Sequence, residues 1–170
     1  MERGPAVDFM NAVLESIDAR DETAVLALNS AFATELSELD QRQLRMLVSQ
    51  AFYARRIGHL DAFLLVLDHT SSGDESPNYL WFRKRFERFV YVDRVVVSHV
   101  ARRNGYARQL YEDLFRKVAD AGHDKIVCEV NVDPPNPQSD AFHERLGFAE
   151  IGRAAIHNGA KSVRYLMRSV

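Results

Sequence analysis

A short basic segment carries residues whose types and spacing suit anion binding. Residues 97–110 read VSHVARRNGYARQL, and within them Arg102 and Gly105 belong to an R-x-x-G-x-A pattern between an expected strand and an expected helix. The first backbone N–H groups of a helix have no intrahelical partner, and with the helix dipole they attract anions. Gly105 lets the backbone approach a ligand, and Arg103 and Arg108 add positive charge. The segment predicts a phosphate or pyrophosphate site; the alternative is a plain turn with solvated arginines.

One carboxylate lies in a segment that is otherwise strand-like and apolar. Glu129 lies in KIVCEVNV, residues 125–132, and alternation puts it on one strand face with Val127 and Asn131. A buried carboxylate is costly unless it has a partner or a task such as proton transfer. Glu129 is therefore the first candidate for a catalytic group; the alternative is an ion pair with an arginine or a hydrogen bond to the backbone.

A second carboxylate lies in the strand-like segment before the basic loop. Asp93 lies in RFVYVDRVVVS, residues 88–98, which is rich in β-branched and aromatic residues and predicts a buried strand. Alternation puts Asp93 on the same face as Tyr91 and Val95. Asp93 is the second candidate for proton transfer, and the alternative is a salt bridge with a neighbouring arginine.

The spacing of apolar residues predicts the elements that would position these groups. Residues 105–121 carry an apolar stripe of helical period and end before Gly122, which is typical of an amphipathic helix. A strand, this helix as crossover and a second strand predict a parallel pair within a mixed sheet. The other predicted helices cover residues 25–39, 40–48 and 139–146, and the other predicted strands cover residues 7–17, 52–57, 62–67, 148–156 and 162–168.

An aromatic and basic stretch at residues 79–89 follows the clearest loop signal of the chain. It is interpreted either as a helix that buries its aromatic rings and solvates its arginines, or as a lid over a binding site. In the second interpretation Trp81 and Phe82 form a wall of that site.

Composition limits the class of protein. The chain has 170 residues, which suits one domain over residues 1–170, and 46% hydrophobic with 27% charged residues excludes disorder. A formal net charge of -2 gives no global attraction to nucleic acid or an anionic membrane. The single cysteine excludes an internal disulfide, which favours a cytoplasmic protein. Four histidines fall in predicted loops without ligand spacing, so no metal site is expected: His59, His69, His123 and His157.

A further motif follows the strand at residues 125–132. Residues 136–148, NPQSDAFHERLGF, supply an asparagine, a short helix and a Gly-Phe end. In order and spacing, this segment and the loop at residues 102–107 resemble the GCN5-related N-acetyltransferase superfamily, whose acetyl-CoA loop reads Q/R-x-x-G-x-G/A. That family's later segment begins with N-x-x-A/S, continues with an apolar residue and a tyrosine, and ends with G-F. The matching positions here are Asn136, Ser139, Phe142, His143, Gly147 and Phe148.

The resemblance implies an α/β fold with a central, splayed mixed sheet flanked by helices. Two parallel strands would part at their carboxyl ends, and the pantetheine arm of acetyl-CoA would lie between them. Backbone groups of residues 95–97 would pair with the pantetheine amides, and backbone amides of residues 103–108 would hold the pyrophosphate. The residues to which the resemblance gives a place in the coenzyme site are Val95, Val96, Val97, Arg102, Arg103, Asn104, Gly105, Tyr106, Ala107, Arg108, Asn136, Ser139 and Phe142.

The resemblance also suggests roles for three side chains. Glu129 matches a glutamate that accepts the amine proton in related enzymes, sometimes through water, and Asp93 is the second candidate for that role. His143 stands where the family often has a tyrosine that protonates the leaving thiolate. His143 either donates a proton in the same way or has no chemical duty. Arg103 replaces a glycine that is common in the loop, and we expect coenzyme binding to survive this change.

The activity implied by the resemblance is direct transfer of an acetyl group from acetyl-CoA to a primary amine, without an acyl-enzyme. The leading hypothesis is a small-molecule amine acceptor, because the long segment at residues 70–89 would close one side of the acceptor site. The alternatives are a protein N-terminus or lysine as acceptor, and a non-catalytic CoA-binding module. We expect neither nucleic acid nor membrane as a partner, and such folds commonly form a homodimer through terminal strands.

Overall fold

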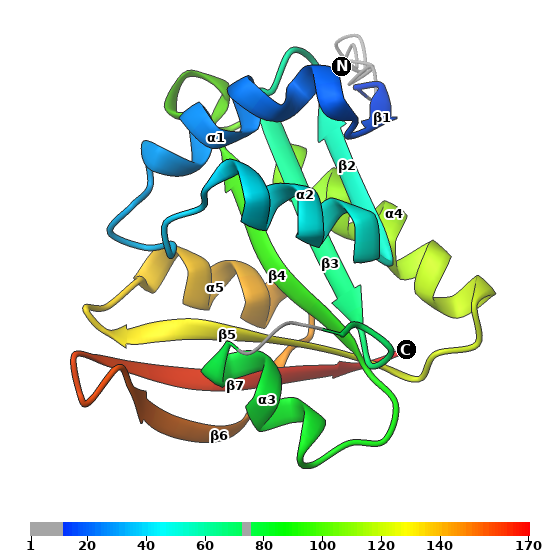
Figure 1. Ribbon diagram of the computed structural model, residues 1–170. Coiled ribbons are helices and arrows are strands. Elements are labelled where there is room, and N and C mark those ends of the chain that lie inside the picture. Colours follow the sequence, from blue (N-terminus) through cyan, green and yellow to red (C-terminus); the bar gives the residue numbers. More distant parts are fainter. Residues whose placement is uncertain (1–11, 73–75) are drawn as a thin grey trace, which may run out of the picture.

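The computed structural model describes residues 12–72 and 76–170, which form one sheet with helices on both faces (Figure 1). The strands are β1 (Leu14–Ser16), β2 (Tyr53–Ile57), β3 (Ala62–Asp68), β4 (Val90–Val97), β5 (Lys125–Asp133), β6 (Ala149–Ile156) and β7 (Lys161–Ser169). The α-helices are α1 (Glu22–Ser30), α2 (Gln41–Gln50), α3 (Pro77–Arg83), α4 (Tyr106–Asp120) and α5 (Pro137–Arg145). None of the helices in the described ranges is both long and apolar enough to cross a bilayer.

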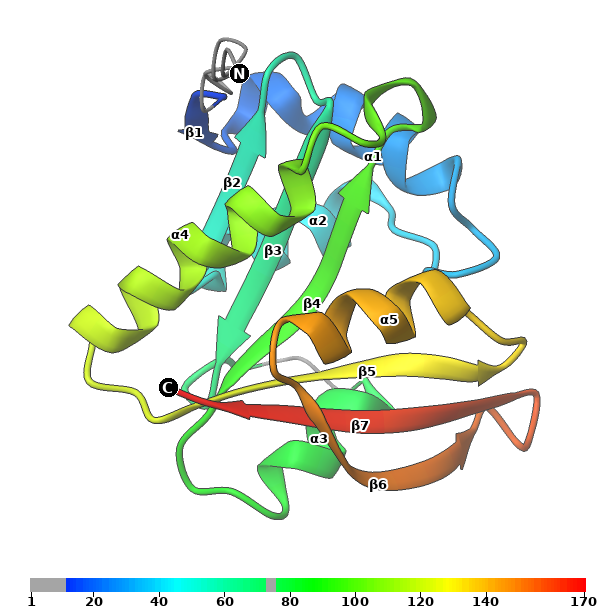
Figure 2. The same ribbon diagram turned by 180° about the vertical axis from the view of Figure 1, so that it is seen from behind.

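The sheet has seven strands in the order β1-β2-β3-β4-β5-β7-β6, and the predicted mixed α/β architecture is confirmed. Every neighbouring pair is antiparallel except β4 and β5, which are parallel and joined through α4. Helices α1, α2 and α3 lie on one face of the sheet, and α4 and α5 lie on the other, as the two opposite views show (Figures 1 and 2). The parallel pair is therefore enclosed by helices on both sides.

The parallel strands β4 and β5 part soon after they begin. Their register contains two pairs, Val90 with Ile126 and Tyr91 with Val127. Beyond these pairs β5 continues alongside β7, whereas β4 continues alongside β3. The predicted splayed sheet is confirmed, and the parting leaves a gap in the middle of the sheet (Figure 2).

A β-bulge interrupts β4 at Asp93. Val66 of β3 is opposite Val92, and the preceding Leu65 is opposite Arg94, so Asp93 is the extra residue. Side chains do not alternate strictly between the two faces at such a point. Tyr91 and Val95, with which Asp93 was predicted to share a face, therefore lie on opposite faces of the sheet. Tyr91 packs in the apolar cluster under α3, while Val95 packs against the cluster under α4. The prediction that Asp93 shares one face with Tyr91 and Val95 is therefore wrong.

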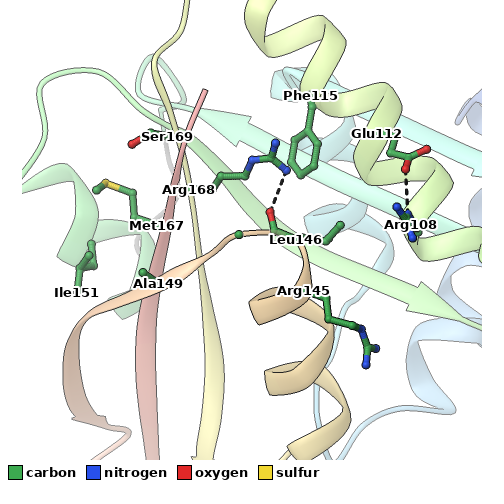
Figure 3. A pocket seen from close by; sticks show the side chains of 11 residues that line it. Arg108, Glu112, Phe115, Arg145, Leu146, Ala149, Ile151, Met167, Arg168 and Ser169 are labelled. Carbon is green, nitrogen blue, oxygen red and sulfur yellow. Dashed lines mark hydrogen bonds and ion pairs between the residues drawn. The ribbon is translucent and has the colours of Figure 1, made fainter.

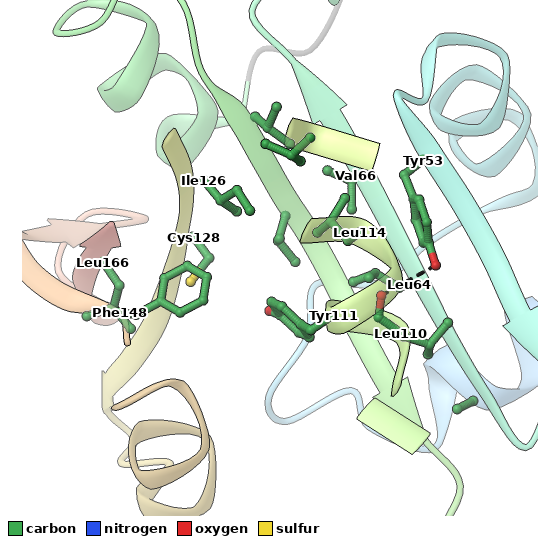
Figure 4. Packing of buried hydrophobic residues seen from close by; sticks show 14 of the residues in the cluster. Tyr53, Leu64, Val66, Leu110, Tyr111, Leu114, Ile126, Cys128, Phe148 and Leu166 are labelled. Carbon is green, nitrogen blue, oxygen red and sulfur yellow. Dashed lines mark hydrogen bonds between the residues drawn. The ribbon is translucent and has the colours of Figure 1, made fainter. Parts of the chain in front are cut away.

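Three apolar clusters hold the helices against the sheet. The largest joins α4 to the middle strands and includes Tyr111, Leu114 and Cys128 (Figure 4). A second lies under α3, and a third lies under α1 and α2. The apolar stripe predicted at residues 105–121 thus becomes the buried side of α4, with Leu110, Tyr111, Leu114 and Val118 fully buried.

The helix predicted over residues 25–39 ends early. Helix α1 stops at Ser30, and the side-chain amide of Asn29 donates to the carbonyl oxygen of Ser37, which draws the following segment back across the sheet. Phe32 and Leu36 still pack against the third cluster from turns rather than from a helix. Helical spacing of apolar residues therefore did not require a continuous helix. Of the strand predicted at residues 7–17, β1 covers Leu14–Ser16, and residues 7–11 lie outside the described part of the chain.

Candidate active site

The basic loop leaves β4 and enters α4 through two left-handed residues. Arg103 has φ 68° and Gly105 has φ 71°, and Gly105 is the N-cap of α4 with no side chain capping the helix start. Glycine adopts this conformation without the steric penalty that other residues carry. Asn104 fixes the loop, because its side-chain amide donates to the carbonyl oxygen of Ala101 at 2.8 Å. A Cβ atom built at Gly105 would meet no atom within 4 Å, so the helix start opens into free space.

A groove of about 910 Å³ runs from this loop through the gap between β4 and β5. Its walls come from both faces of the sheet: the α1–α2 connection with Phe32 and Glu35 on one side, and Tyr111 and His143 of α4 and α5 on the other. The volume is typical of a small-molecule or cofactor site. The sequence-predicted residues that line it are Asp93, Val95, Val96, Val97, Arg102, Arg103, Gly105, Tyr106, Ala107, Arg108, Glu129, Asn136, Ser139, Phe142 and His143. Asn104 is the one predicted residue outside that lining, and its hydrogen bond to the Ala101 carbonyl oxygen stabilises the loop.

Residues 95–97 present one unpaired strand edge to the groove. Val95, Val96 and Val97 lie opposite Leu64, Phe63 and Ala62 of β3, which takes up one edge. On the other edge β5 has already departed, since its pairing with β4 ends at Tyr91. Unpaired backbone N–H and C=O groups at such an edge can hydrogen-bond an extended ligand.

A second hollow of about 670 Å³ lies beside the groove, between α4, the end of α5 and the last strands (Figure 3). Arg108 and Arg145 line both spaces. Arg108 is paired with Glu112 at 2.9 Å, and Arg168 donates to the carbonyl oxygen of Leu146 at 2.9 Å. Three arginines, Arg108, Arg145 and Arg168, thus line this hollow.

Glu129 lies at the parting of the strands with its carboxylate buried. Its Oε1 atom accepts hydrogen bonds from the Asn78 amide at 3.1 Å and the Tyr91 hydroxyl at 3.0 Å. Its Oε2 atom is buried and has no hydrogen-bond partner among the described residues. Burial raises the pKa of Glu129 to about 8, and the nearby Asp93 carboxylate adds to the rise. The arginine partner considered from the sequence is not found in the described structure, and the carboxylate is placed to take up a proton near neutral pH.

The residues that hold Glu129 could not be predicted from the sequence. Asn78 comes from α3, and its own side-chain oxygen accepts a hydrogen bond from the Tyr165 hydroxyl of β7 at 3.0 Å. Trp81 of the same helix stacks on Tyr165 with ring centroids 4.0 Å apart. The one available signal was a single amide inside the aromatic stretch SPNYLWF, which by itself is not specific.

Asp93 has the partner that the sequence suggested as its alternative. The Arg94 Nε atom donates to its carboxylate at 2.6 Å, and both side chains are nearly buried. Arg94 also donates to Asn29 Oδ1 at 2.8 Å and to the Ser37 carbonyl oxygen at 3.2 Å. Asp93 is thus engaged in a buried ion pair that ties the α1–α2 connection to β4, and it also lines the groove.

His143 is buried and uses both ring nitrogens. Nδ1 lies 2.8 Å from the Ser139 carbonyl oxygen, which accepts only, so Nδ1 carries the hydrogen. Nε2 then accepts from the Tyr111 hydroxyl at 2.8 Å. Burial lowers the pKa of His143, which favours this neutral form. In that form the imidazole has no spare proton for the groove, and Tyr111 is a groove residue that its place on the apolar stripe of α4 had concealed.

The remaining predicted groups have structural positions. Asn136 caps α5, because its side-chain oxygen accepts from the Ser139 backbone N–H at 3.3 Å. Trp81 and Phe82 pack on the sheet and do not line the groove, as expected for the helix interpretation of residues 79–89 rather than the lid.

Comparison with known proteins agrees with this geometry. A model of the acetyltransferase (GNAT) family matches residues 52–148, which is more than half of the chain. No curated protein matches. Solved structures of similar fold include the ribosomal-protein-S18-alanine N-acetyltransferase from Escherichia coli, which is 16% identical with a TM-score of 0.68 over 93% of both chains.

Two further structures are similar to the same degree. Ard1 from Thermoplasma volcanium is 14% identical, with a TM-score of 0.73 over 95% of this chain and 99% of that one. NAA60 from Arabidopsis thaliana in complex with acetyl-CoA is 14% identical, with a TM-score of 0.72 over 93% and 98%. At these identities the likeness concerns the fold. Since the family model spans the parted strands, the basic loop and α4, this chain belongs to the acetyltransferase (GNAT) family and is an enzyme of the acyltransferase class.

Proposed function

We propose that this protein transfers an acetyl group from acetyl-CoA directly to the primary amine of a small-molecule acceptor. The observation that carries the proposal is a single groove faced by an uncapped helix start, an unpaired strand edge and the buried Glu129 carboxylate. These features suit a phosphate-bearing coenzyme, an extended arm that contains amides, and an amine that must lose a proton.

The residues around α4 fit the coenzyme. Backbone N–H groups of residues 103–108 would bind the pyrophosphate, because the start of α4 is uncapped and the space beside Gly105 is free. The unpaired edge at residues 95–97 would bind the amides of the pantetheine arm. When bound, acetyl-CoA supplies an acetyl group activated as a thioester.

Glu129 is the proposed proton acceptor. With a pKa of about 8 it competes for a proton near neutral pH, and Asn78 and Tyr91 hold Oε1 so that Oε2 remains free. Oε2 takes the proton that the amine loses as the new carbon–nitrogen bond forms. The carbon–sulfur bond breaks in the same reaction, and its electron pair leaves with the sulfur.

We assign the proton for the departing sulfur to Tyr111 and a positioning role to His143. The hydrogen between these side chains belongs to the Tyr111 hydroxyl while His143 is neutral. Burial raises the pKa of Tyr111 well above its ordinary value, so the hydroxyl holds its proton until the thiolate forms. His143→Gln should therefore alter the alkaline side of the pH profile of kcat and leave acetyl-CoA affinity unchanged.

The choice of a small acceptor rests on contacts that narrow the groove. The side-chain amide of Asn131 donates to the Glu35 carbonyl oxygen at 3.1 Å, which ties the α1–α2 connection to β5 across the gap. Asn78 of α3 reaches Glu129 from the same face of the sheet. A small amine suits such a restricted approach better than an extended chain.

A protein N-terminus is the second candidate acceptor. It is favoured by the similar fold of the ribosomal-protein-S18-alanine N-acetyltransferase from Escherichia coli. A structure of Arabidopsis thaliana Naa50 with the bisubstrate analogue CoA-Ac-MVNAL is also similar, with a TM-score of 0.71. The Asn131–Glu35 contact distinguishes the two candidates, because a peptide would need that approach to open.

The coenzyme is tested by calorimetric titration of acetyl-CoA into the wild type, Gly105→Glu and Gly122→Glu. Gly105 and Gly122 stand at opposite ends of α4, both have φ above +70°, and neither has an atom within 4 Å of a built Cβ. The two variants therefore carry the same backbone strain and the same added charge. We expect micromolar binding, about −8 kcal/mol, to the wild type and Gly122→Glu but not to Gly105→Glu. Equal binding to both variants would contradict the proposed phosphate site.

The acceptor is tested by release of CoA with a panel of small primary amines and a panel of peptides with free N-termini. Faster turnover of small amines supports the first candidate, and faster turnover of peptides supports the second. Binding of acetyl-CoA without turnover in either panel would leave a non-catalytic CoA-binding module and would contradict the proposed transfer.

A further inference from the structure

We propose that Asp68, His69 and His123 bind one divalent transition-metal ion, with Zn²⁺ as the expected ion. Asp68 and His69 stand at the end of β3, and His123 lies in the turn between α4 and β5. One potential ligand atom from each side chain lies within 4.8 Å of the others. The histidines are scattered along the sequence, but the fold brings two of them together beside a carboxylate. None of the three residues lines the groove between β4 and β5.

Two unpartnered imidazole nitrogens form the second observation. Nδ1 of His69 and Nδ1 of His123 are both buried and have no hydrogen-bond partner among the described residues. The two rings meet edge to face with centroids 5.6 Å apart. Buried polar atoms are normally paired, and an unpaired nitrogen calls for a ligand that the protein itself does not supply. A metal ion accepts a lone pair from each ring and satisfies both at once.

The surroundings hold the three side chains in place. Asp68 Oδ1 accepts hydrogen bonds from the Thr70 backbone N–H at 2.9 Å and from the Thr70 hydroxyl at 2.6 Å, which orients the carboxylate. Aromatic rings flank the imidazoles. The ring centroids of Phe52 and His123 are 5.4 Å apart, and those of Phe89 and His69 are 6.5 Å apart. Ligands that are oriented by such neighbours bind metal more tightly than mobile ones.

Charged side chains lie around His123. Burial lowers the pKa of that imidazole, and the charge of Arg88, which is one of them, lowers it further. Asp68 and Asp124 act in the opposite direction on this pKa, and Asp124 is itself paired with Lys125 at 2.7 Å. Asp68 balances one positive charge of the ion, whereas Arg88 is the nearby charge that opposes it.

The donor set selects the class of ion. Two imidazoles and one carboxylate suit Zn²⁺, which binds three protein ligands and one water in tetrahedral geometry. Mg²⁺ and Ca²⁺ prefer oxygen ligands throughout. The ion would connect the end of β3 to the turn before β5, at the end of the sheet where β4 and β5 are still paired. It would therefore stabilise the fold at a distance from the groove.

The test is calorimetric titration of Zn²⁺ into metal-stripped protein. We expect one equivalent to bind to the wild type. His69→Gln and His123→Gln should each weaken binding by more than about 100-fold, and Thr70→Val, which removes one hydrogen bond to Asp68, by about tenfold. His59→Gln is the matched control, because His59 is an exposed histidine in the turn before β3. Nitrogen-15 spectra of the imidazoles should shift for His69 and His123 on addition of Zn²⁺ and not for His59.

Two results would overturn the site. One is the absence of Zn²⁺ binding to folded wild type, and the other is equal binding by the wild type and both glutamine variants, which would mark an adventitious ion only. Circular dichroism of each metal-free variant checks its fold. If a histidine variant does not fold, Asp68→Asn keeps the size of the side chain and removes its charge, and it is expected to weaken binding in the same direction.

Discussion

The two ends of the β4–β5 pair differ in what their side chains do. At the paired end, Val90, Tyr91, Ile126 and Val127 are packed with almost no exposure. Two residues further along β5, the same strand carries Glu129, whose carboxylate is buried with one oxygen unpartnered. The paired end is filled with buried apolar side chains, whereas the open end borders the groove that Glu129 lines. Within a few residues, the two ends of this strand pair thus serve stability and chemistry respectively. Mutations at the paired end should lower the free energy of unfolding and leave activity nearly unchanged, and mutations at the open end should lower activity.

The largest expected effect is at the open end. Glu129→Gln keeps the shape of the side chain and its two hydrogen bonds at Oε1, but it removes the proton acceptor. The rate of acetyl transfer should fall by about 100- to 1000-fold, as is typical when a general base is lost, while acetyl-CoA affinity stays the same. Steady-state kinetics and calorimetry measure the two quantities. Glu87→Gln, at an exposed residue in the bend before β4 that does not line the groove, is the control. A Glu129→Gln variant with full activity would remove Glu129 from the reaction.

The reverse signature is expected at the paired end. Ile126→Ala deletes a fully buried side chain from the cluster under α4, so the free energy of unfolding should fall by about 3 kcal/mol. Acetyl transfer by the folded variant should stay within about twofold of the wild type. Urea unfolding and kinetics at 25 °C measure the two effects. A large loss of turnover in the folded variant would show that the two ends are coupled.

The pH dependence of stability sharpens the comparison. Glu129 has a pKa of about 8 in the folded protein against an ordinary value of 4.5. Between these values the folded state holds a proton that the unfolded state has lost, so wild-type stability falls as pH rises, by about 1.4 kcal/mol per pH unit. The Glu129→Gln variant has no ionisable group at this position, so its stability does not fall with pH for this reason. In urea unfolding, the variant should therefore gain stability relative to the wild type from pH 5 to pH 8. A constant difference over that window would contradict the raised pKa.

The smallest expected effect concerns a neighbour of Glu129. The Tyr91 hydroxyl donates to Oε1 and holds the pKa of Glu129 down, against the effect of burial. Tyr91→Phe should therefore move the acid limb of the kcat/KM profile to higher pH, with a loss of about two- to fivefold at pH 7. Tyr79→Phe is the control, because Tyr79 is a buried tyrosine whose hydroxyl donates to backbone carbonyls of residues 68 and 71. An unchanged limb in Tyr91→Phe would show that this hydrogen bond does not tune the carboxylate.

Local patterns predicted the parts of the site that are local in the chain. The R-x-x-G-x-A loop, the amphipathic α4 and the strand face of Glu129 each depend on neighbours within a few residues, and the structure has all three. The residues that hold Glu129 come from α3 and β7, and only the folded chain brings Asn78 and Tyr165 together. Likewise, His143 could be placed beside the groove from its motif, but its bond to Tyr111 depends on how α4 and α5 pack.

The bulge at Asp93 has a consequence for insertions and deletions. It changes the parity of β4, so residues on the odd positions before it share a face with residues on the even positions after it: Tyr91 lies on the side of Arg94, and Val92 on the side of Val95. Deleting Asp93 would restore regular alternation and leave every later side chain on its present face, because Val92 and Arg94 already lie opposite consecutive residues of β3. A one-residue deletion here would thus disturb the faces of β4 less than a deletion elsewhere in the strand, and sequence alignments that place the gap at another position of β4 would misassign the wall of the groove.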